Sequence, residues 1–282
     1  MKLALGTVQF GLSYGVSNTQ GIPSDNQLAE IFSMATKYQL NTFDTAIAYG
    51  NAEERIAPFL NQDSKVISKF PKPSSKGELE NAIVQSLQTL RLESLYGFMS
   101  HNGDFLIENP KLWDVLLKFK SDRKINKIGY SLYHPEQLEK LLKLGLQPDI
   151  IQVPFSLLDR KFEPYFKELK SNNVEIHCRS VFLQGLYFLD LNKIPTKLEV
   201  LKPSLLTLHQ VAKDAKNEMV DLALNYVLEN KFVDKVVIGV ENAKQLEQSI
   251  SSSLRWKEDK EIFEAINNIK VVNKELLNPA NW

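Results

Sequence analysis

The segment NTFDTAIAYG, residues 41–50, begins as an apolar run and then places Asp44 and Tyr49 where that run ends. The run has the length and the β-branched content of a short buried strand. A second run of this kind, KVISKF (65–70), follows it along the chain. Strands that are apolar along their whole length are typical of parallel sheets, because helices cover both faces of such sheets. This stretch therefore favours an α/β fold.

The same alternation of short apolar runs and amphipathic stretches continues along the whole chain. Amphipathic stretches lie, for example, at 25–39, 77–91, 135–144 and 161–172, and Ser24 is a suitable N-cap for the first. Eight such repeats in about 250 residues predict one (β/α)8 TIM barrel domain that spans residues 1–282. The expected strands are 3–10, 41–46, 65–70, 95–100, 125–131, 149–156, 174–181 and 234–240.

The spacing between the last two expected strands is longer than elsewhere. It leaves room for two helices, at 204–216 and 218–230, so we expect extra helices after strand seven. A further helix is expected at 258–270, and the C-terminal tail after it ends in Trp282.

The amino-acid composition limits the classes of molecule that the protein is expected to bind. The chain has 282 residues, its 34 basic residues balance 34 acidic ones, and its pI is near 6.9. We therefore expect no binding to nucleic acid or to a membrane surface, and small molecules are the expected partners. We also expect no signal peptide at the N-terminus, and no run is long enough to span a bilayer. The single cysteine, Cys178, fits a reducing compartment, so a cytoplasmic location is expected. Nothing in these patterns specifies an oligomeric state.

Several motifs of other enzyme classes are missing from the sequence. It contains no GxxxxGK[ST], no GxGxxG and no GxSxG, which disfavours a P-loop, a Rossmann site and a serine hydrolase. No pair of histidines has the spacing of metal ligands, so we expect no metal site. The histidines are His101, His134, His177 and His209.

The residues at the ends of three successive strands suggest a reaction. In a parallel barrel the carboxyl ends of the strands form the active face, and Asp44, Tyr49, Lys69 and His101 all lie there. Reducing a carbonyl needs a proton donor at its oxygen, and a phenol suits this role if its pKa falls from about 10. Lys69 is the expected cause of such a fall. Asp44 would hold the lysine, and His101 would donate a hydrogen bond to the substrate oxygen.

Each of these side chains also has an ordinary structural explanation when it is taken singly. The carboxylate could cap a helix, the phenol could pack, the lysine could be a surface charge, and the histidine could simply end a strand. Their joint occurrence in order on strands two, three and four favours the catalytic interpretation.

The motifs LALGTVQFG, FDTAIAYG, ISKF, SHN, IGYS and VVIGVENAKQLEQSI together resemble the aldo-keto reductases. These enzymes are (β/α)8 barrels that use a Tyr, Lys, Asp and His tetrad with a nicotinamide cofactor. The resemblance covers essentially the whole chain and implies NAD(P)H-dependent reduction of an aldehyde or ketone, with a sugar-derived carbonyl as one candidate. In the order of the family motif, Asp44, Tyr49, Lys69 and His101 take the four catalytic places, with Tyr49 as general acid.

The resemblance also implies a set of cofactor-binding residues. Ser131 and Gln152 would hold the nicotinamide carboxamide. Arg179 departs from the pattern, because the family places an aromatic there that stacks on the nicotinamide; the arginine either contacts the cofactor or forms a salt bridge on the rim. The remaining implied residues are Gly6, Thr7, Val8, Asp44, Ser180, Phe182, Gln184, Gly239, Val240, Asn242, Gln245 and Ser249.

Coenzyme choice and substrate pocket are also read from the resemblance. The family usually uses NADPH, but Glu241 and Gln245 replace residues that commonly hold the 2′-phosphate, which leaves NADH as a second possibility; Lys244 could compensate. Four aromatic residues are candidates for the wall around a small carbonyl substrate: Tyr14, Phe105, Phe188 and Trp282. For the last three, ordinary packing is at least as good an explanation.

Two other functions remain open at this point. The first is a regulatory or assembly protein that binds the cofactor in the same barrel but turns over slowly, which the unusual Arg179 would fit. The second is a sugar-phosphate isomerase that uses His101 and Asp44. The isomerase is disfavoured because the chain lacks a recognisable phosphate or metal site.

Overall fold

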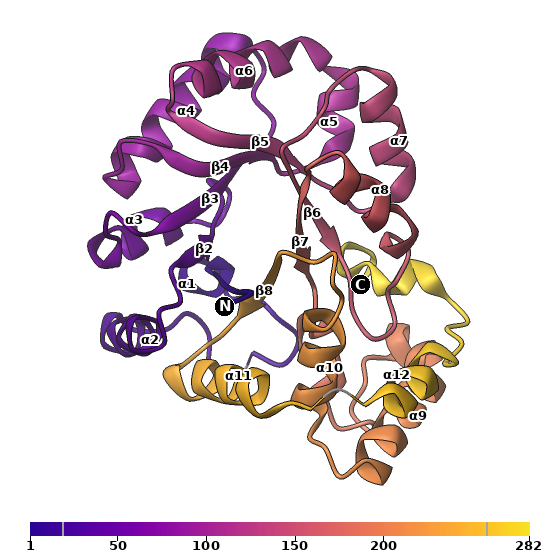
Figure 1. Ribbon diagram of the computed structural model, residues 1–282. Coiled ribbons are helices and arrows are strands. Elements are labelled where there is room, and N and C mark those ends of the chain that lie inside the picture. The colour runs from indigo at the N-terminus through magenta and orange to yellow at the C-terminus, as the bar shows by residue number, and fades with distance from the viewer. Residues whose placement is uncertain (19, 258) are drawn as a thin grey trace.

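The protein is a closed barrel of eight parallel strands, as the sequence predicted (Figure 1). A computed structural model describes residues 1–18, 20–257 and 259–282. Each strand pairs with the next in chain order, and β8 returns to pair with β1. The strands are β1 (Leu3–Gly6), β2 (Thr42–Asp44), β3 (Lys65–Phe70), β4 (Leu95–Ser100), β5 (Ile125–Ser131), β6 (Ile150–Pro154), β7 (Glu175–Arg179) and β8 (Lys235–Gly239).

Helices surround the barrel in Figure 1. Ser24 and Gln27 form a capping box at the start of α2, and the Ser75 side chain accepts from the Glu78 amide at the start of α4. The helices are α1 (Val8–Gly11), α2 (Asp25–Lys37), α3 (Ala52–Ile56), α4 (Lys76–Leu90), α5 (Gly103–Glu108), α6 (Trp113–Ser121), α7 (Pro135–Lys143), α8 (Phe166–Ser171), α9 (Lys202–Asp214), α10 (Met219–Leu228), α11 (Ala243–Arg255) and α12 (Lys260–Asn267). The extra helices expected after strand seven are α9 and α10.

Some predicted boundaries were wrong. The first strand ends at Gly6 and not at residue 10, because the Thr7 amide donates to the carbonyl of Asp44 and the chain then turns into α1. The helix expected at 161–172 begins only at Phe166, since a 3₁₀ turn (Glu163–Tyr165) containing a proline precedes it. The expected helix at 258–270 corresponds to α12, and Glu258 lies outside the described residues.

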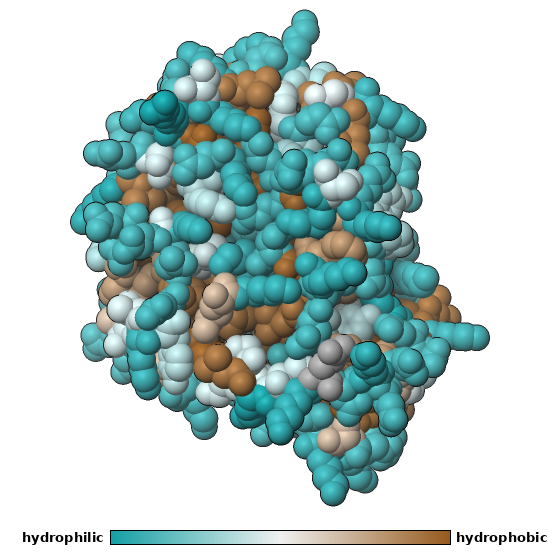
Figure 2. Space-filling model, in the orientation of Figure 1, coloured by the Kyte–Doolittle hydropathy of each residue, from teal (hydrophilic) through white to brown (hydrophobic). Residues whose placement is uncertain are grey.

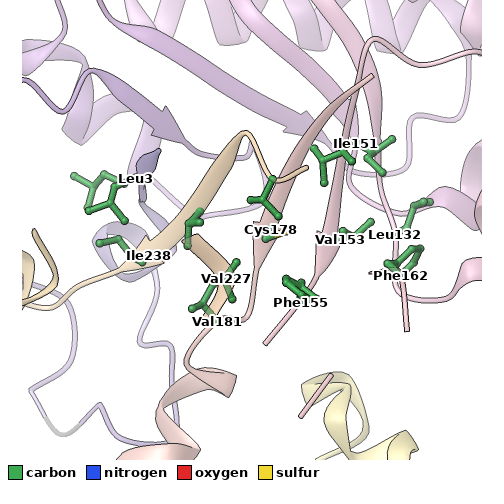
Figure 3. Close-up of a cluster of buried hydrophobic side chains, with 14 of the residues drawn as sticks. Leu3, Leu132, Ile151, Val153, Phe155, Phe162, Cys178, Val181, Val227 and Ile238 are labelled. Carbon is green, nitrogen blue, oxygen red and sulfur yellow. The ribbon is translucent and has the colours of Figure 1, made fainter. Parts of the chain in front are cut away.

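A large apolar layer lies between the strands and the surrounding helices. Figure 3 shows part of it, with Val227 of α10 between Ile238 of β8 and Cys178 of β7, and Ile151 of β6 farther along the sheet. A separate small cluster joins Ile67, Met99 and Ile150. Because β4 and β6 are not neighbours, these last side chains can meet only inside the barrel. The alternation along each strand thus fills two layers with apolar residues.

The outer surface carries mainly polar residues. Figure 2 shows hydrophilic side chains over most of the face seen in Figure 1, with apolar ones visible between them near the centre of the view. Within residues 1–18, 20–257 and 259–282, no helix combines the length and the apolar character required to cross a bilayer.

The close approach of β5 and β6 at Gly129 yields a testable prediction. A Cβ atom on Gly129 would lie 1.7 Å from the carbonyl oxygen of Ile150, so Gly129→Ala forces the strands apart. We expect a loss of at least about 2 kcal/mol in the free energy of unfolding, measured by urea denaturation. The control is Gly77→Ala in α4, where a Cβ meets nothing within 4 Å and should stabilise the protein by about 0.5–1 kcal/mol. Equal stability of the two variants would contradict this account.

Candidate active site

A cavity of about 730 Å³ opens at the carboxyl ends of the strands. This volume lies in the range of small-molecule and cofactor sites. It gathers most of the residues that the sequence analysis selected for catalysis and cofactor binding. Those that line it are Gly6, Thr7, Val8, Asp44, Tyr49, His101, Ser131, Gln152, Arg179, Ser180, Phe182, Gln184, Gly239, Val240, Gln245 and Ser249.

A buried ion pair lies beneath this cavity. Lys69 follows Ile67 by two residues in β3, so its side chain also points into the barrel, where it is fully buried. Its Nζ donates to Asp44 Oδ1 at 2.6 Å and to the carbonyl oxygen of Thr45 at 2.8 Å. The second carboxylate oxygen, Asp44 Oδ2, accepts from Gln152 Nε2 at 2.7 Å. Through Gln152, these hydrogen bonds link β2, β3 and β6.

Tyr49 stands above this pair in a tightly packed turn. The centre of its ring lies 5.3 Å from Lys69 Nζ and 5.5 Å from the centre of the His101 ring, which meets it edge-on at 77°. Two glycines make the turn possible. A Cβ on Gly11 would come within 1.8 Å of the Tyr49 carbonyl oxygen, and Gly50 has a φ of +58°. The phenol, the ammonium and the imidazole thus meet at one end of the cavity.

The expected lowering of the phenol's pKa is not found. Burial and the Asp44 carboxylate raise the pKa of Tyr49 well above its usual value, and the charge that opposes them is that of Arg179. Burial is the largest cause, and Lys69 does not offset it because its ammonium is bound at 2.6 Å by Asp44, which itself raises the pKa of the phenol. Burial also lowers the pKa of Lys69, against the attraction of Asp44.

His101 is uncharged at neutral pH. Burial, together with the positive charge of Lys69, lowers the pKa of His101 to about 4. A neutral imidazole has one ring N–H donor, which suits a hydrogen bond to a carbonyl oxygen. The backbone amide of His101 donates to the Phe70 carbonyl at 3.0 Å, which ties the end of β4 to β3.

Arg179 ends β7 and lines the cavity without an acidic partner. No carboxylate of residues 1–18, 20–257 or 259–282 forms a salt bridge with it, so the salt bridge considered for the rim is absent from the described chain. Its guanidinium lies over the ring of Tyr133, 4.3 Å from the ring centre. It also donates to the Leu132 carbonyl oxygen at 3.0 Å and to Ser180 Oγ at 3.2 Å.

The loop after β1 and the segment after β7 meet at the cavity. Tyr14 and Val16 belong to the first and Gln184 to the second. The Tyr14 hydroxyl accepts from Gln184 Nε2 at 2.7 Å, and the Val16 amide donates to the Gln184 carbonyl at 3.1 Å. Tyr14 and Phe188 both line the cavity. These two predicted substrate residues are therefore in place to contact a ligand.

Besides Lys69, which lies beneath the cavity, three predicted site residues do not line it. Phe105 is buried in α5 within the apolar layer. Trp282 packs against the core, and its indole Nε1 donates to the Leu276 carbonyl oxygen at 2.8 Å. Asn242 caps α11, where its side chain accepts from the amide of Gln245. We do not assign a ligand contact to any of them.

Sequence reasoning missed several residues that line the cavity, among them the polar Tyr133, Glu218 and Gln248. Tyr133 lies just beyond β5, so the rule that strand ends form the active face could have found it. Glu218 precedes α10 and Gln248 lies within α11, where no strand end marks them. Gln248 Nε2 donates to Glu218 Oε2 at 2.9 Å.

Comparison with known proteins identifies the family. A sequence model of the aldo/keto reductase family matches residues 2–270. The chain belongs to this family. Aldo-keto reductases reduce carbonyl groups with a nicotinamide cofactor, typically NADPH, and this protein is accordingly an oxidoreductase.

Individual aldo-keto reductases and related enzymes resemble the chain at lower identity. Chloroplastic pyridoxal reductase from Arabidopsis thaliana is 26% identical over 275 residues, covering 83% of this chain and 73% of that protein. L-glyceraldehyde 3-phosphate reductase from Escherichia coli (strain K12) is 25% identical over 319 residues, covering 97% and 88%. Two solved structures share the fold. The holo form of an aldo-keto reductase from Bacillus halodurans has a TM-score of 0.79 at 18% identity, covering 95% and 91%. Glycerol dehydrogenase from Gluconobacter oxydans has a TM-score of 0.76 at 20% identity, covering 95% and 90%.

The buried pair of this aldo-keto reductase predicts a distinctive pattern of stability. Lys69→Met leaves the Asp44 carboxylate buried without its counter-charge and should cost about 3–5 kcal/mol in the free energy of unfolding. Asp44→Asn combined with Lys69→Met removes both charges and should recover most of that loss. Urea denaturation measures both.

The control is Lys118→Met, which removes an exposed ammonium from a surface pair with Glu80 and should cost less than about 1 kcal/mol. A Lys69→Met variant no less stable than this control would show that the pair does not stabilise the barrel.

Proposed function

We propose that the protein reduces a small aldehyde or ketone to the alcohol, with Tyr49 as the proton donor. The observation that carries this proposal is the convergence of Tyr49, His101 and the Asp44–Lys69 pair at one end of the cavity. The phenol of Tyr49 is protonated at neutral pH, as it would be at its ordinary pKa, and this is the form that a reduction requires. Arg179 is the charge that opposes the rise in the phenol's pKa, so it favours the phenolate left after proton transfer.

In this reduction the carbonyl carbon receives a hydride and the carbonyl oxygen receives a proton. A reduced nicotinamide held by the cofactor-binding residues would supply the hydride to the carbonyl carbon. Tyr49 gives its hydroxyl proton to the oxygen, so that C–H and O–H bonds form as the π bond breaks. His101 donates a hydrogen bond that fixes the oxygen near the phenol, and Asp44 keeps Lys69 in place.

The cavity wall fits a nicotinamide dinucleotide. Gly6 of β1 and Gly239 of β8 are paired across the two strands, and both line the cavity. Because neither has a side chain, only backbone atoms line the cavity at these two residues. Beside them the buried Thr7 Oγ1 and Gln9 Oε1 have no hydrogen-bond partner, which leaves polar atoms for a polar cofactor. Ser131 and Gln152 would hold the carboxamide, as the family resemblance implies.

The charges in the cavity favour NADH over the NADPH that the family typically uses. Figure 1 shows α10 and α11 across the barrel from β4, so they border the end of the cavity away from His101. Two carboxylates line that end, Glu218 and Glu241, and Gln248 holds the first in position. Arg179 is the only lysine or arginine among the cavity-lining residues described. A 2′-phosphate would meet negative charge there, whereas a carboxylate can accept a hydrogen bond from a free ribose hydroxyl.

A small aldehyde is the proposed class of substrate. Pyridoxal and L-glyceraldehyde 3-phosphate, named in two relatives, are both small aldehydes. Tyr14 and Phe188 supply aromatic contact at the cavity wall. The lone buried cysteine, Cys178, fits the cytoplasmic location that we propose.

Removing the phenolic hydroxyl tests the proton donor. Tyr49→Phe keeps the ring and its contact with His101 but cannot supply the proton, so kcat for a generic aldehyde should fall about 10²–10⁴-fold. Steady-state kinetics measure the loss, and cofactor fluorescence should show unchanged binding. Tyr133→Phe serves as the matched control, because it removes a phenolic hydroxyl from the same cavity outside the reacting group. Equal kcat for Tyr49→Phe and wild type would remove Tyr49 from the mechanism.

Neutralising the two carboxylates tests the coenzyme assignment. The ratio of the NADPH to the NADH dissociation constant should exceed 1 in the wild type and fall at least about 10-fold, or about 1.4 kcal/mol, in Glu218→Gln/Glu241→Gln. Fluorescence titration of each coenzyme gives the ratio without any turnover. Glu247→Gln in α11 is the control, since this carboxylate does not line the cavity. Tighter binding of NADPH than of NADH by the wild type would contradict the assignment.

A further inference from the structure

Arg179 is a guanidinium held rigidly but without a counter-charge. It ends β7, lines the cavity and is half-buried. Its two hydrogen-bond acceptors, the Leu132 carbonyl and the Ser180 hydroxyl, are both uncharged. The ring of Tyr133 supports its face at 4.3 Å. A guanidinium has more N–H groups than these two acceptors use, so donors remain for a ligand.

The charge of this arginine acts at the reacting end of the cavity. Burial raises the pKa of Tyr14, and burial together with Asp44 raises that of Tyr49; Arg179 opposes both increases. It also contributes, after burial and Lys69, to the low pKa of His101. These three side chains line the same cavity as Arg179. The positive charge therefore lies near the place where the carbonyl would bind.

The other groups at that end do not balance this charge. Asp44 is matched by Lys69 at 2.6 Å, and Tyr49 and His101 are uncharged at neutral pH. Arg179 is thus a charge of the described cavity lining that no carboxylate pairs, whereas Asp44 is paired with Lys69. Partial burial of an unpaired charge is unfavourable, and an anion beside it would offset that cost.

We propose that Arg179 binds an anionic group, a carboxylate or a phosphate, carried by the carbonyl substrate itself. The fork of N–H groups matches either oxyanion, and stacking on Tyr133 fixes the plane of that fork. This inference rests on the proposed function, because it concerns the substrate of the same reaction. It makes Arg179 a specificity-determining residue that selects aldehydes bearing a negative charge.

The first experiment compares matched neutral and anionic aldehydes. The pairs are benzaldehyde with 4-carboxybenzaldehyde, butanal with succinic semialdehyde, and glyceraldehyde with glyceraldehyde 3-phosphate. The measured quantity is the ratio of kcat/KM for the anionic member to that for the neutral member. The wild type should favour the anionic members. Arg179→Met should lower the ratio by about 30-fold, which is the size of loss expected when a hydrogen bond to a charged group is removed. Arg179→Lys keeps the charge but lacks the planar fork of N–H donors, so its ratio should lie between those of the wild type and Arg179→Met.

Two controls keep the result specific. Lys213→Met removes an exposed cation from α9, away from the cavity, and should leave the ratio as in the wild type. Circular dichroism of Arg179→Met checks its fold, and Arg179→Gln provides a second neutral variant if the first unfolds. An unchanged ratio in a folded neutral variant overturns the proposal.

A binding measurement separates this inference from the proposed function. Calorimetry of 4-carboxybenzaldehyde and of benzaldehyde, each with the enzyme saturated in oxidised coenzyme, reports the anion preference without turnover. A wild type that prefers the carboxylate yet reduces no aldehyde keeps the Arg179 site and overturns only the proposed reaction. A coenzyme dissociation constant that rises at least about 10-fold in Arg179→Met, with no change in anion preference, assigns the arginine to the coenzyme phosphates and overturns the proposal.

Discussion

The arrangement of the site depends on one ion pair buried inside the barrel. An ammonium with no exposure to water must have a carboxylate beside it, since the cost of leaving it alone is several kcal/mol. Asp44 meets this need for Lys69, and Gln152 in turn binds the other oxygen of Asp44. These contacts join β2, β3 and β6 beneath the turn after β2 that carries Tyr49. The position of the phenol follows from the same contacts that stabilise the barrel.

This pairing also changes the explanation of acidity at the site. A lysine next to a tyrosine suggests, from sequence alone, a phenol made acidic by positive charge. In the folded protein Asp44 binds that lysine, and Arg179 at the end of β7 is the cation that opposes the raised pKa of Tyr49. Burial and net charge are properties of the assembled cavity, so the order of residues along the chain could not reveal them.

The barrel itself could be read from the sequence because its strands are apolar along their length and recur with helical stretches between them. The four catalytic candidates were found because they lie at strand ends. The end of β1 was missed, since TVQF (7–10) has the composition of a strand yet turns away at a hydrogen bond from Thr7 to Asp44. Glu218 was missed for a different reason: it precedes a helix, and only the path of the chain after β7 brings it to the cavity. Phe105 and Trp282 looked like pocket walls because aromatic composition does not distinguish a core contact from a ligand contact.

Gln184 ties two segments of the cavity wall together. Its side chain donates to the Tyr14 hydroxyl and its carbonyl accepts from the Val16 amide, which joins the loop after β1 to the segment after β7. Both bonds are made by Gln184, so a single residue couples the loop after β1 to the segment after β7, and a displacement of either one breaks contacts of the other.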